Sequence, residues 1–307
     1  MKGIVYLILA GFFIGTTAIW IKMIGSAISP FVLTMFRVFI AAMLSLVLIF
    51  FVKNLKILWT ERKYAVHLIL SGFFGVTIGF GLFIEALQYV PVANVVLLVG
   101  VSPVTTAFLA YFFLKENITK WEIIGLVLVI LGIGAIYGPE INLQANVFGN
   151  ILAVLAGAGY SVFVVSMRYL EQKKIPFYAV TFWPMLIGCL FMLLFLPFEP
   201  IAISLSGMVM FFVFMLAFST FLGFTFFAEG LKTIRAHNAP IIILLAEPIV
   251  GIGLAWLILG EVPPMYIYLG GFLIILANLL VEKEVRKKKL GKKSTTIYKK
   301  PQPLHKK

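Results

Sequence analysis

An ionisable side chain in the middle of a long apolar segment carries the most specific chemistry of this chain. Glu247 lies about eleven residues after Ala236 and about thirteen before Gly260, far from both ends of the segment. A carboxyl group in such surroundings is suited to carry a proton or to bind a cationic part of a solute. The alternative is a protonated or hydrogen-bonded group that only fixes helix packing. Glu247 is therefore our first candidate for coupling or substrate binding.

A second ionisable group, Arg37, follows Pro30 by seven residues inside another apolar segment. A guanidinium group there can bind a carboxylate or phosphate of a substrate through its planar fork of donors. It can equally extend toward the membrane surface, or pair with a glutamate, without touching a substrate. Both interpretations are open.

Two prolines lie at matching depths of two apolar segments, and both are hinge candidates. Pro103 and Pro248 each remove one backbone hydrogen bond from a helix, and freed backbone is tolerated where it lines a cavity. A plain packing kink is the alternative. Ser102 precedes Pro103 as Glu247 precedes Pro248, so a hydroxyl in one copy stands opposite a carboxyl in the other. Such an asymmetric site suits an asymmetric substrate.

The remaining candidates are polar or amphipathic side chains within apolar segments. Tryptophan also fits a membrane interface, and buried asparagine also bonds across helices. Glu85 and Glu229 fall near segment ends and are gate candidates, whereas Glu116 and Glu261 precede helices whose free N–H groups they are expected to cap. The further substrate-contact candidates are Thr16, Trp20, Asn94, Tyr160 and Asn238.

The elements that must position these residues are membrane helices. The 307 residues are 62% apolar and 12% charged, with a mean hydropathy of +1.09, whereas soluble domains average about 25% charged residues. One cysteine and three scattered histidines exclude a Cys-based cluster and offer no ligand spacing, so we expect no metal and no cofactor. The absence of convergent catalytic groups argues against an enzyme.

Ten segments are long and apolar enough to cross a bilayer as helices. Their apolar runs lack the alternation of a barrel strand. The fold class is therefore an all-α polytopic membrane protein. The predicted spans are 3–21, 31–52, 65–86, 91–113, 121–138, 147–167, 176–197, 207–228, 238–259 and 264–281.

Basic residues predict the orientation of these spans. Of the 25 Lys and Arg residues, 23 fall at the N-terminus, in even-numbered gaps or in the tail, so both termini are expected on the cytoplasmic side of the cell (plasma or inner) membrane. The tail, 282–307, is expected to be disordered and to lie near anionic lipid head groups. Nucleic-acid binding is not expected. The state of assembly, monomer or homodimer, is open.

An internal repeat divides the chain near an offset of 145 residues. Leu9-Ala10-Gly11 returns as Leu155-Ala156-Gly157, and Phe83-Ile84-Glu85 returns as Phe227-Ala228-Glu229. We predict a first five-helix repeat at 1–138, an external linker at 139–146 and a second repeat at 147–281. Because five is odd, the second repeat must be inverted, and equivalent loops indeed carry opposite charge patterns. Inverted repeats are typical of secondary transporters.

The repeat also resembles a known family. A proline-containing helix, a glutamate and a last helix end each repeat, as Ser102-Pro103 to Lys115-Glu116 and Glu247-Pro248 to Gly260-Glu261. With Pro30 and Arg37, residues 3–281 resemble the EamA-type members of the drug/metabolite transporter superfamily. The resemblance implies a ten-helix carrier that exports or exchanges small metabolites. It also implies a central cavity lined mainly by helices one, three, four, six, eight and nine.

The expected function is secondary active transport of a small organic metabolite by alternating access, with export favoured. Hydrophobic amino acids and other amphipathic solutes suit a mainly apolar cavity with few charges. The chain lacks a G-x-x-x-x-G-K-[ST] loop, so it does not itself use ATP. An uncoupled channel or lipid scramblase is the alternative, and a membrane-embedded enzyme is less favoured.

Overall fold

The computed structural model describes residues 2–52, 61–115, 120–137, 144–173, 175, 177–198, 202–204, 206–234, 239–273, 275–277 and 279–280. These residues form helices, with no strand among them beyond one antiparallel bridge between Ile28 and Ile203. The α-helices are α1 Lys2–Ile24, α2 Pro30–Phe51, α4 Ala65–Leu70, α5 Gly81–Tyr89, α6 Val92–Leu98, α7 Ser102–Leu114, α8 Lys120–Tyr137, α9 Gln144–Gln172, α10 Phe177–Met192, α11 Gly207–Leu231 and α12 Ala239–Leu254. The 3-10 helices are Gly25–Ala27, Glu61–Tyr64, Val99–Val101 and Leu196–Phe198, and the π-helices are Ser71–Phe80 and Ala255–Leu259.

Six helical stretches of the described chain are long and apolar enough to cross a membrane. They correspond to predicted spans one, two, three, four, six and eight, which confirms a helical membrane protein. Shorter apolar helices lie within the other four predicted spans, so the count of ten stays a prediction. The long stretches are Lys2–Ala27, Pro30–Phe51, Ala65–Tyr89, Val92–Leu114, Val147–Leu170 and Gly207–Leu231; the shorter ones are Ile123–Gly132, Val180–Met192, Ala246–Leu259 and Met265–Ala277.

Local sequence explains where several helices begin and end. Pro30 is the first residue of α2, where its missing N–H costs nothing, and it follows an extended Ser29. The Ser206 side chain accepts a hydrogen bond from the Val209 N–H at the start of α11. At the ends, Lys115 after α7 has a φ of 54° and Gly260 after the second π-helix has a φ of 69°. These left-handed residues turn the chain away from the helix axis.

The boundaries around α9 differ from the sequence prediction. α9 begins at Gln144 and ends at Gln172, so it extends past both ends of the predicted 147–167 span. The predicted linker 139–146 therefore overlaps the first turn of α9, and its residues 139–143 lie outside the described chain. The predicted tail 282–307 and the candidate Asn238 lie outside it as well.

The fourth span is broken where its proline stands, and the ninth is not. α6 passes through the 3-10 turn Val99–Val101 before α7 restarts with Ser102 and Pro103 in its first turn. α12 instead continues through Pro248 and changes to a π-helix only at Ala255. The matched prolines thus have different local structures, because the helix restarts at the first and runs through the second.

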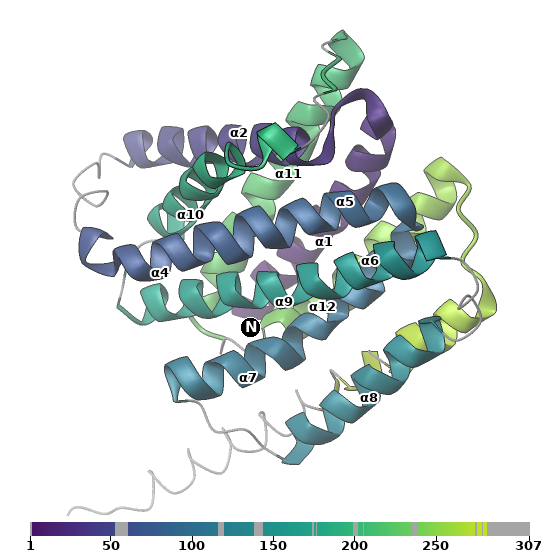
Figure 1. Cartoon of the computed structure of the whole chain (residues 1–307). Coiled ribbons are helices and arrows are strands. Elements are labelled where there is room, and N and C mark those ends of the chain that lie inside the picture. The colour runs from purple at the N-terminus through teal and green to yellow at the C-terminus, as the bar shows by residue number, and fades with distance from the viewer. Residues whose placement is uncertain are drawn as a thin grey trace, which may run out of the picture.

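α1 and α9 each pack closely against several other helices of the bundle (Figure 1). α1 packs against α11 and α12, whereas α9 packs against the Ser71–Phe80 π-helix, α5 and α7. Glycines permit these approaches: a Cβ on Gly15 would lie 2.7 Å from the Glu247 carbonyl oxygen, and one on Gly75 would lie 2.5 Å from the Phe163 Cβ. α8 lies at the edge of the bundle next to α7.

Buried apolar side chains form two clusters, one toward each end of the bundle. Leu7 and Ala10 of α1 belong to the cluster near the N-terminus, and Ala18 and Ile21 belong to the cluster at the other end. Along α1, the boundary between the two clusters therefore lies between residues 10 and 18. Residues at this boundary line the central cavity described next.

Candidate functional site

A small central cavity of about 40 Å³ lies where the two apolar clusters meet. Its lining combines two opposite charges, two hydroxyl groups and an apolar, partly aromatic surface. The elements implied by the family resemblance all contribute, and α2 is added to them through Arg37. The lining residues are Ile14, Thr17, Arg37, Gly79, Phe80, Phe83, Val99, Ala156, Tyr160, Phe224 and Glu247.

The guanidinium of Arg37 is buried in the cavity wall. Arg37 is 3% exposed. Its Nε donates a 2.6 Å hydrogen bond to Thr220 Oγ1 on α11, and Thr220 in turn donates to the Leu216 carbonyl at 2.7 Å. The Phe80 ring lies 4.9 Å below the guanidinium, a cation–π distance. The Nη1 atom is buried and has no hydrogen-bond partner within the described residues.

Glu247 enters the cavity from α12, opposite in charge to Arg37. It is 8% exposed, and Gly15 of α1 packs against its backbone carbonyl. The two charges attract each other across the cavity, yet no direct ion pair joins them in the described structure. Arg37 and Glu247 therefore lie on the walls of one cavity without a direct contact between them in the described structure.

Tyr160 of α9 supplies a second free donor to the same cavity. Its hydroxyl is buried without a hydrogen-bond partner among the described residues. Its ring lies 6.2 Å from those of Phe224 and Phe227. Buried polar groups are normally hydrogen-bonded, so the Tyr160 hydroxyl and Arg37 Nη1 are each a donor without a partner among the described residues.

Four other sequence candidates lie outside the central cavity. Thr16 Oγ1 and Trp20 Nε1 donate to Ser219 Oγ of α11 at 3.1 and 3.3 Å, so they join α1 to α11. Ser102 accepts a 3.0 Å hydrogen bond from Ser161 Oγ through its backbone carbonyl. Asn94 Nδ2 donates to Asn150 Oδ1 at 3.5 Å. Each of the four thus takes part in a contact between helices, and Thr16 Oγ1 also bonds to the Phe13 carbonyl of its own helix at 2.7 Å.

The gate candidates differ from each other. Glu229 forms an ion pair of 2.5 Å with Lys232, three residues later at the end of α11. Glu85 is half-buried on α5 beside Tyr89. Glu116 lies outside the described residues, and the expected capping by Glu261 of the helix that follows it is wrong. Glu261 Oε2 instead accepts a 2.9 Å hydrogen bond from the Val92 N–H, at the start of α6.

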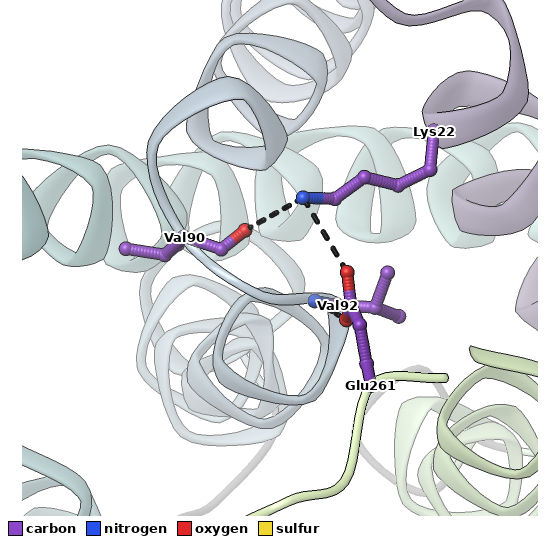
Figure 2. Close-up of polar contacts among 4 residues, drawn as sticks. All are labelled: Lys22, Val90, Val92 and Glu261. Atoms are coloured by element: carbon purple, nitrogen blue, oxygen red, sulfur yellow. Dashed lines mark hydrogen bonds and ion pairs between the residues drawn. The ribbon is translucent and has the colours of Figure 1, made fainter. Parts of the chain in front are cut away.

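Glu261 belongs to a second polar cluster that sequence reasoning did not assemble (Figure 2). Lys22 Nζ lies 3.6 Å from Glu261 Oε1 and donates a 3.3 Å hydrogen bond to the Val90 carbonyl. The cluster borders a cleft of about 290 Å³ that Asn94 also lines. One sequence signal pointed here: Lys22 is the one basic residue in an odd-numbered gap.

Phe80, Phe224 and Thr220 are further site residues that sequence reasoning missed. Phe80 and Phe224 occupy the same position of the internal repeat, since Gly79-Phe80 returns as Gly223-Phe224 at an offset of 144. Their rings stack at 5.1 Å between centroids. Extending the repeat alignment inward from Phe83 and Phe227 would have found this pair.

Comparisons with known proteins agree with the fold and the resemblance. The model of the EamA-like transporter family matches residues 1–138 and 147–282. The chain is 27% identical to the uncharacterized transporter YyaM of Bacillus subtilis, over 92% of this chain and 94% of the relative. It is 26% identical to an uncharacterized transporter of Archaeoglobus fulgidus, over 92% and 99% of the two chains. A crystal structure with 18% sequence identity superposes with a TM-score of 0.70 over 93% of this chain and 98% of the other. The chain belongs to the EamA-like transporter family.

Proposed function

We propose that this chain is a secondary active transporter that moves a small amphipathic metabolite across the cell membrane by alternating access. It would do so with ten helices in two inverted five-helix repeats, with both termini cytoplasmic. The observation that carries the proposal is the central cavity, where Arg37, Glu247 and Tyr160 from three helices face a shared space. Family membership supports the general class, a membrane transporter.

Equivalent helix crossings support the inverted repeat. In the first, a Cβ on Gly11 of α1 would lie 2.7 Å from the Ala246 Cβ of α12. In the second, a Cβ on Gly157 of α9 would lie 2.7 Å from Val101 Cγ1. The repeat offset relates Gly11 to Gly157 and Val101 to Ala246. Equivalent residues therefore meet at two crossings, which supports two repeats related by a pseudo-twofold axis in the membrane plane.

The chemistry of the cavity favours a zwitterion with an apolar side chain, such as a hydrophobic amino acid. The free donors of Arg37 and Tyr160 suit a carboxylate, and the Glu247 carboxylate suits an ammonium group. Phe80 and Phe224 offer apolar surface for the remainder. The family resemblance implies export, and we propose that a proton gradient acting through Glu247, or exchange of solutes, drives it.

The size of the cavity supports a mechanism with large helix movements. Its volume of about 40 Å³ is far below the roughly 300–1,000 Å³ of ordinary ligand pockets. Helices must separate before a solute of amino-acid size can bind, so this conformation corresponds to a closed state. Rocking of one repeat against the other would open the cavity to one face at a time.

The test is a solute-panel counterflow assay with the purified protein in proteoliposomes, with and without a pH gradient. The panel contains zwitterionic amino acids of increasing side-chain hydrophobicity, a dicarboxylate and a diamine. We expect saturable counterflow for apolar zwitterions and little for solutes that carry only one sign of charge. Conductance without saturation, or lipid movement without solute counterflow, would contradict the proposal and favour a channel or a scramblase.

A further inference from the structure

The second polar cluster joins parts of the chain that belong to different halves. Lys22 lies in the last turn of α1, and Val90 and Val92 flank the junction between α5 and α6. All three belong to the first segment that matches the family model. Glu261 lies in the second segment, on the connection between the Ala255–Leu259 π-helix and Met265. The ion pair and the bond to the Val92 N–H therefore join one half of the chain to the other (Figure 2). We call these two contacts, made by Lys22 and Glu261, the clasp.

A second tie joins the halves through main-chain hydrogen bonds. The Ser29 N–H donates to the Ala202 carbonyl at 3.0 Å, and the Ser204 N–H donates to the Ala27 carbonyl at 2.8 Å. This tie follows directly on the end of α1, three residues after Ile24. The end of the bundle opposite the N-terminus is thus held together by contacts of two independent kinds.

The clasp lies between the central cavity and the face opposite the N-terminus. Thr17 lines the cavity, and Lys22 follows it on α1 by five residues, about 7.5 Å along the axis. On the other half, Glu247 lines the cavity and Ala255, eight residues later, lines the cleft beside Glu261. Buried apolar side chains, Ile19 and Ile21 among them, fill the interval on α1. The clasp is therefore farther along α1 and the second half than the cavity, on the side of this face.

We infer that Lys22 and Glu261 form the gate of the transport path at this face, which the topology assigns to the outside of the cell. This inference rests on the proposed alternating-access function. In the closed conformation the ion pair holds the loop after the π-helix against the α5–α6 junction. When the halves rock apart, the pair separates and the cleft of about 290 Å³ becomes continuous with the central cavity.

The strength of the clasp suits a contact that breaks in every cycle. The Lys22 and Glu261 side chains are 25% and 26% exposed, and partly exposed ion pairs contribute little net stability. Both groups also become hydrated when they separate, so opening leaves no buried charge without a partner. By contrast, the Glu229–Lys232 pair joins neighbours at the end of one helix and would not report on movement between the halves.

The first experiment crosslinks the gate. In a Cys189→Ala background, Lys22→Cys and Glu261→Cys are combined and treated with a short bifunctional methanethiosulfonate reagent. We expect counterflow in proteoliposomes to fall more than tenfold and to return after reduction with dithiothreitol. Each single cysteine variant, treated in the same way, is the control for modification alone. Undiminished counterflow in the crosslinked protein would overturn the gate and leave the transporter intact.

The second experiment needs no substrate. Thr17→Cys in the same background places a thiol in the cavity wall, and a membrane-impermeant maleimide is applied from each face in turn. Breaking the clasp with Lys22→Gln or Glu261→Gln should raise labelling from the outer face at least fivefold. Lys63→Ala removes an exposed lysine elsewhere and should leave labelling unchanged. Labelling that ignores the clasp would overturn the inference.

The two readouts separate failure of the gate from failure of the proposed function. If labelling follows the clasp while no solute of the panel shows counterflow, Lys22 and Glu261 control access to the cavity and the transport proposal fails. If counterflow is found but labelling ignores the clasp, the transporter stands and the gate fails. Gel filtration of each variant, together with the conservative Lys22→Arg exchange, which should restore closed-state labelling, shows that the changes arise in a folded protein.

Discussion

The two segments that match the family model contribute equivalent residues to opposite walls of one cavity, and they differ in the charges they bring. Phe80 and Phe224 occupy the same repeat position and stack on each other at 5.1 Å. Ile14 and Tyr160 are likewise equivalent, and both line the cavity. The shape of the cavity therefore follows from repetition of one helix arrangement.

The charges have no such counterparts. The repeat offset places Trp183 of α10 where α2 has Arg37, and Ser102 where α12 has Glu247. The supporting groups diverge with them: Thr220, which holds the guanidinium, corresponds to Val76. One half thus supplies the cation and the other supplies the anion. Equivalent residues of the two halves line the cavity, and we propose that the residues in which the halves differ determine what binds there.

The helix crossings repeat this pattern. At one crossing, Gly15 has no side chain and lies directly against the Glu247 carbonyl. At the equivalent crossing, Ser161 donates a 3.0 Å hydrogen bond to the Ser102 carbonyl and contacts Thr105 Oγ1. The crossing near Ser102 is bridged by hydroxyl groups, whereas the crossing near Glu247 leaves its carboxylate for the cavity. We propose that this difference makes the second half the place of coupling.

The largest expected effect comes from substituting Glu247 and Ser102 separately, since these equivalent positions carry different groups. Glu247→Gln removes a buried negative charge that faces the cavity. Because hydrogen bonds to charged groups are worth about 1.5–3 kcal/mol, we expect counterflow of a zwitterionic solute to fall roughly 10- to 100-fold. Its response to a pH gradient should disappear as well. Ser102→Ala, at the equivalent position, should lower counterflow by less than about threefold, because we expect the loss of this hydroxyl to cost only about 0.5 kcal/mol.

Equal losses for Glu247→Gln and Ser102→Ala would contradict a division of roles between the halves. The measurement is initial counterflow in proteoliposomes with matched protein density. The Glu247→Asp variant keeps the charge on a shorter side chain, and it should keep part of the pH-gradient response. Loss of that response in Glu247→Asp, with folding intact, would make geometry and not charge the decisive property.

The shared packing can be tested with matched glycines. Gly11→Ala would bring a Cβ within 2.7 Å of the Ala246 Cβ, and Gly157→Ala would bring one within 2.7 Å of Val101 Cγ1. We expect each to destabilise the protein by about 1–3 kcal/mol through overpacking, as a lower thermal midpoint in detergent. Gly253→Ala on α12, where no atom lies within 4 Å of the added Cβ, is the control and should be neutral or slightly stabilising. Strongly unequal effects at Gly11 and Gly157 would break the symmetry argument.

Much of this architecture follows from the sequence, because its signals are large. Apolar runs of twenty residues predict membrane helices in their observed order, and the repeat at an offset near 145 predicts which crossings are equivalent. Arg37 and Glu247 are identifiable because burying a charge in the membrane costs free energy, so such residues often serve a function. The small-residue motif Gly11-x-x-x-Gly15 marks a crossing without naming the partner helix.

The partners across the bundle were beyond sequence reasoning, because they depend on how distant helices rotate against one another. Arg37 meets Thr220, 183 residues away, and nothing in either segment specifies that rotation. Trp20 fits an interfacial position by type, yet it bonds to Ser219. Glu261 was expected to cap its own following helix, but it bonds to the first N–H of α6. The type of a residue indicates that its polar group needs a partner when it is buried. Tertiary packing determines which residue that partner is.

Support of the cation by the other half gives a smaller predicted effect. Thr220→Val makes α11 resemble its counterpart at Val76 and leaves Arg37 Nε without its acceptor. We expect the substrate KM to rise about tenfold with little change in the maximal rate, since one hydrogen bond to a charged group is worth about 1.5 kcal/mol or more. Thr34→Val, on α2, is the control, because the Thr34 hydroxyl bonds only to the Pro30 carbonyl of its own helix. An unchanged KM in Thr220→Val would separate Arg37 from substrate binding.

The smallest effect concerns the aromatic pair that the halves share, and it sharpens the comparison most finely. Phe80→Leu and Phe224→Leu each remove one ring of a stacked pair, worth about 0.5–1.5 kcal/mol. If the two rings served only the symmetric shape of the cavity, both variants would raise KM equally, by no more than about tenfold. Phe80, however, also lies 4.9 Å below the Arg37 guanidinium, and a cation–π contact adds about 0.5–2 kcal/mol. Phe80→Leu should therefore raise KM more than Phe224→Leu.

In an Arg37→Gln background the two increases in KM should become equal, because the larger effect of Phe80→Leu requires the charge of Arg37. Persistence of the difference without the arginine would show that the rings differ for reasons of packing, and that divergence between the halves extends to the cavity walls.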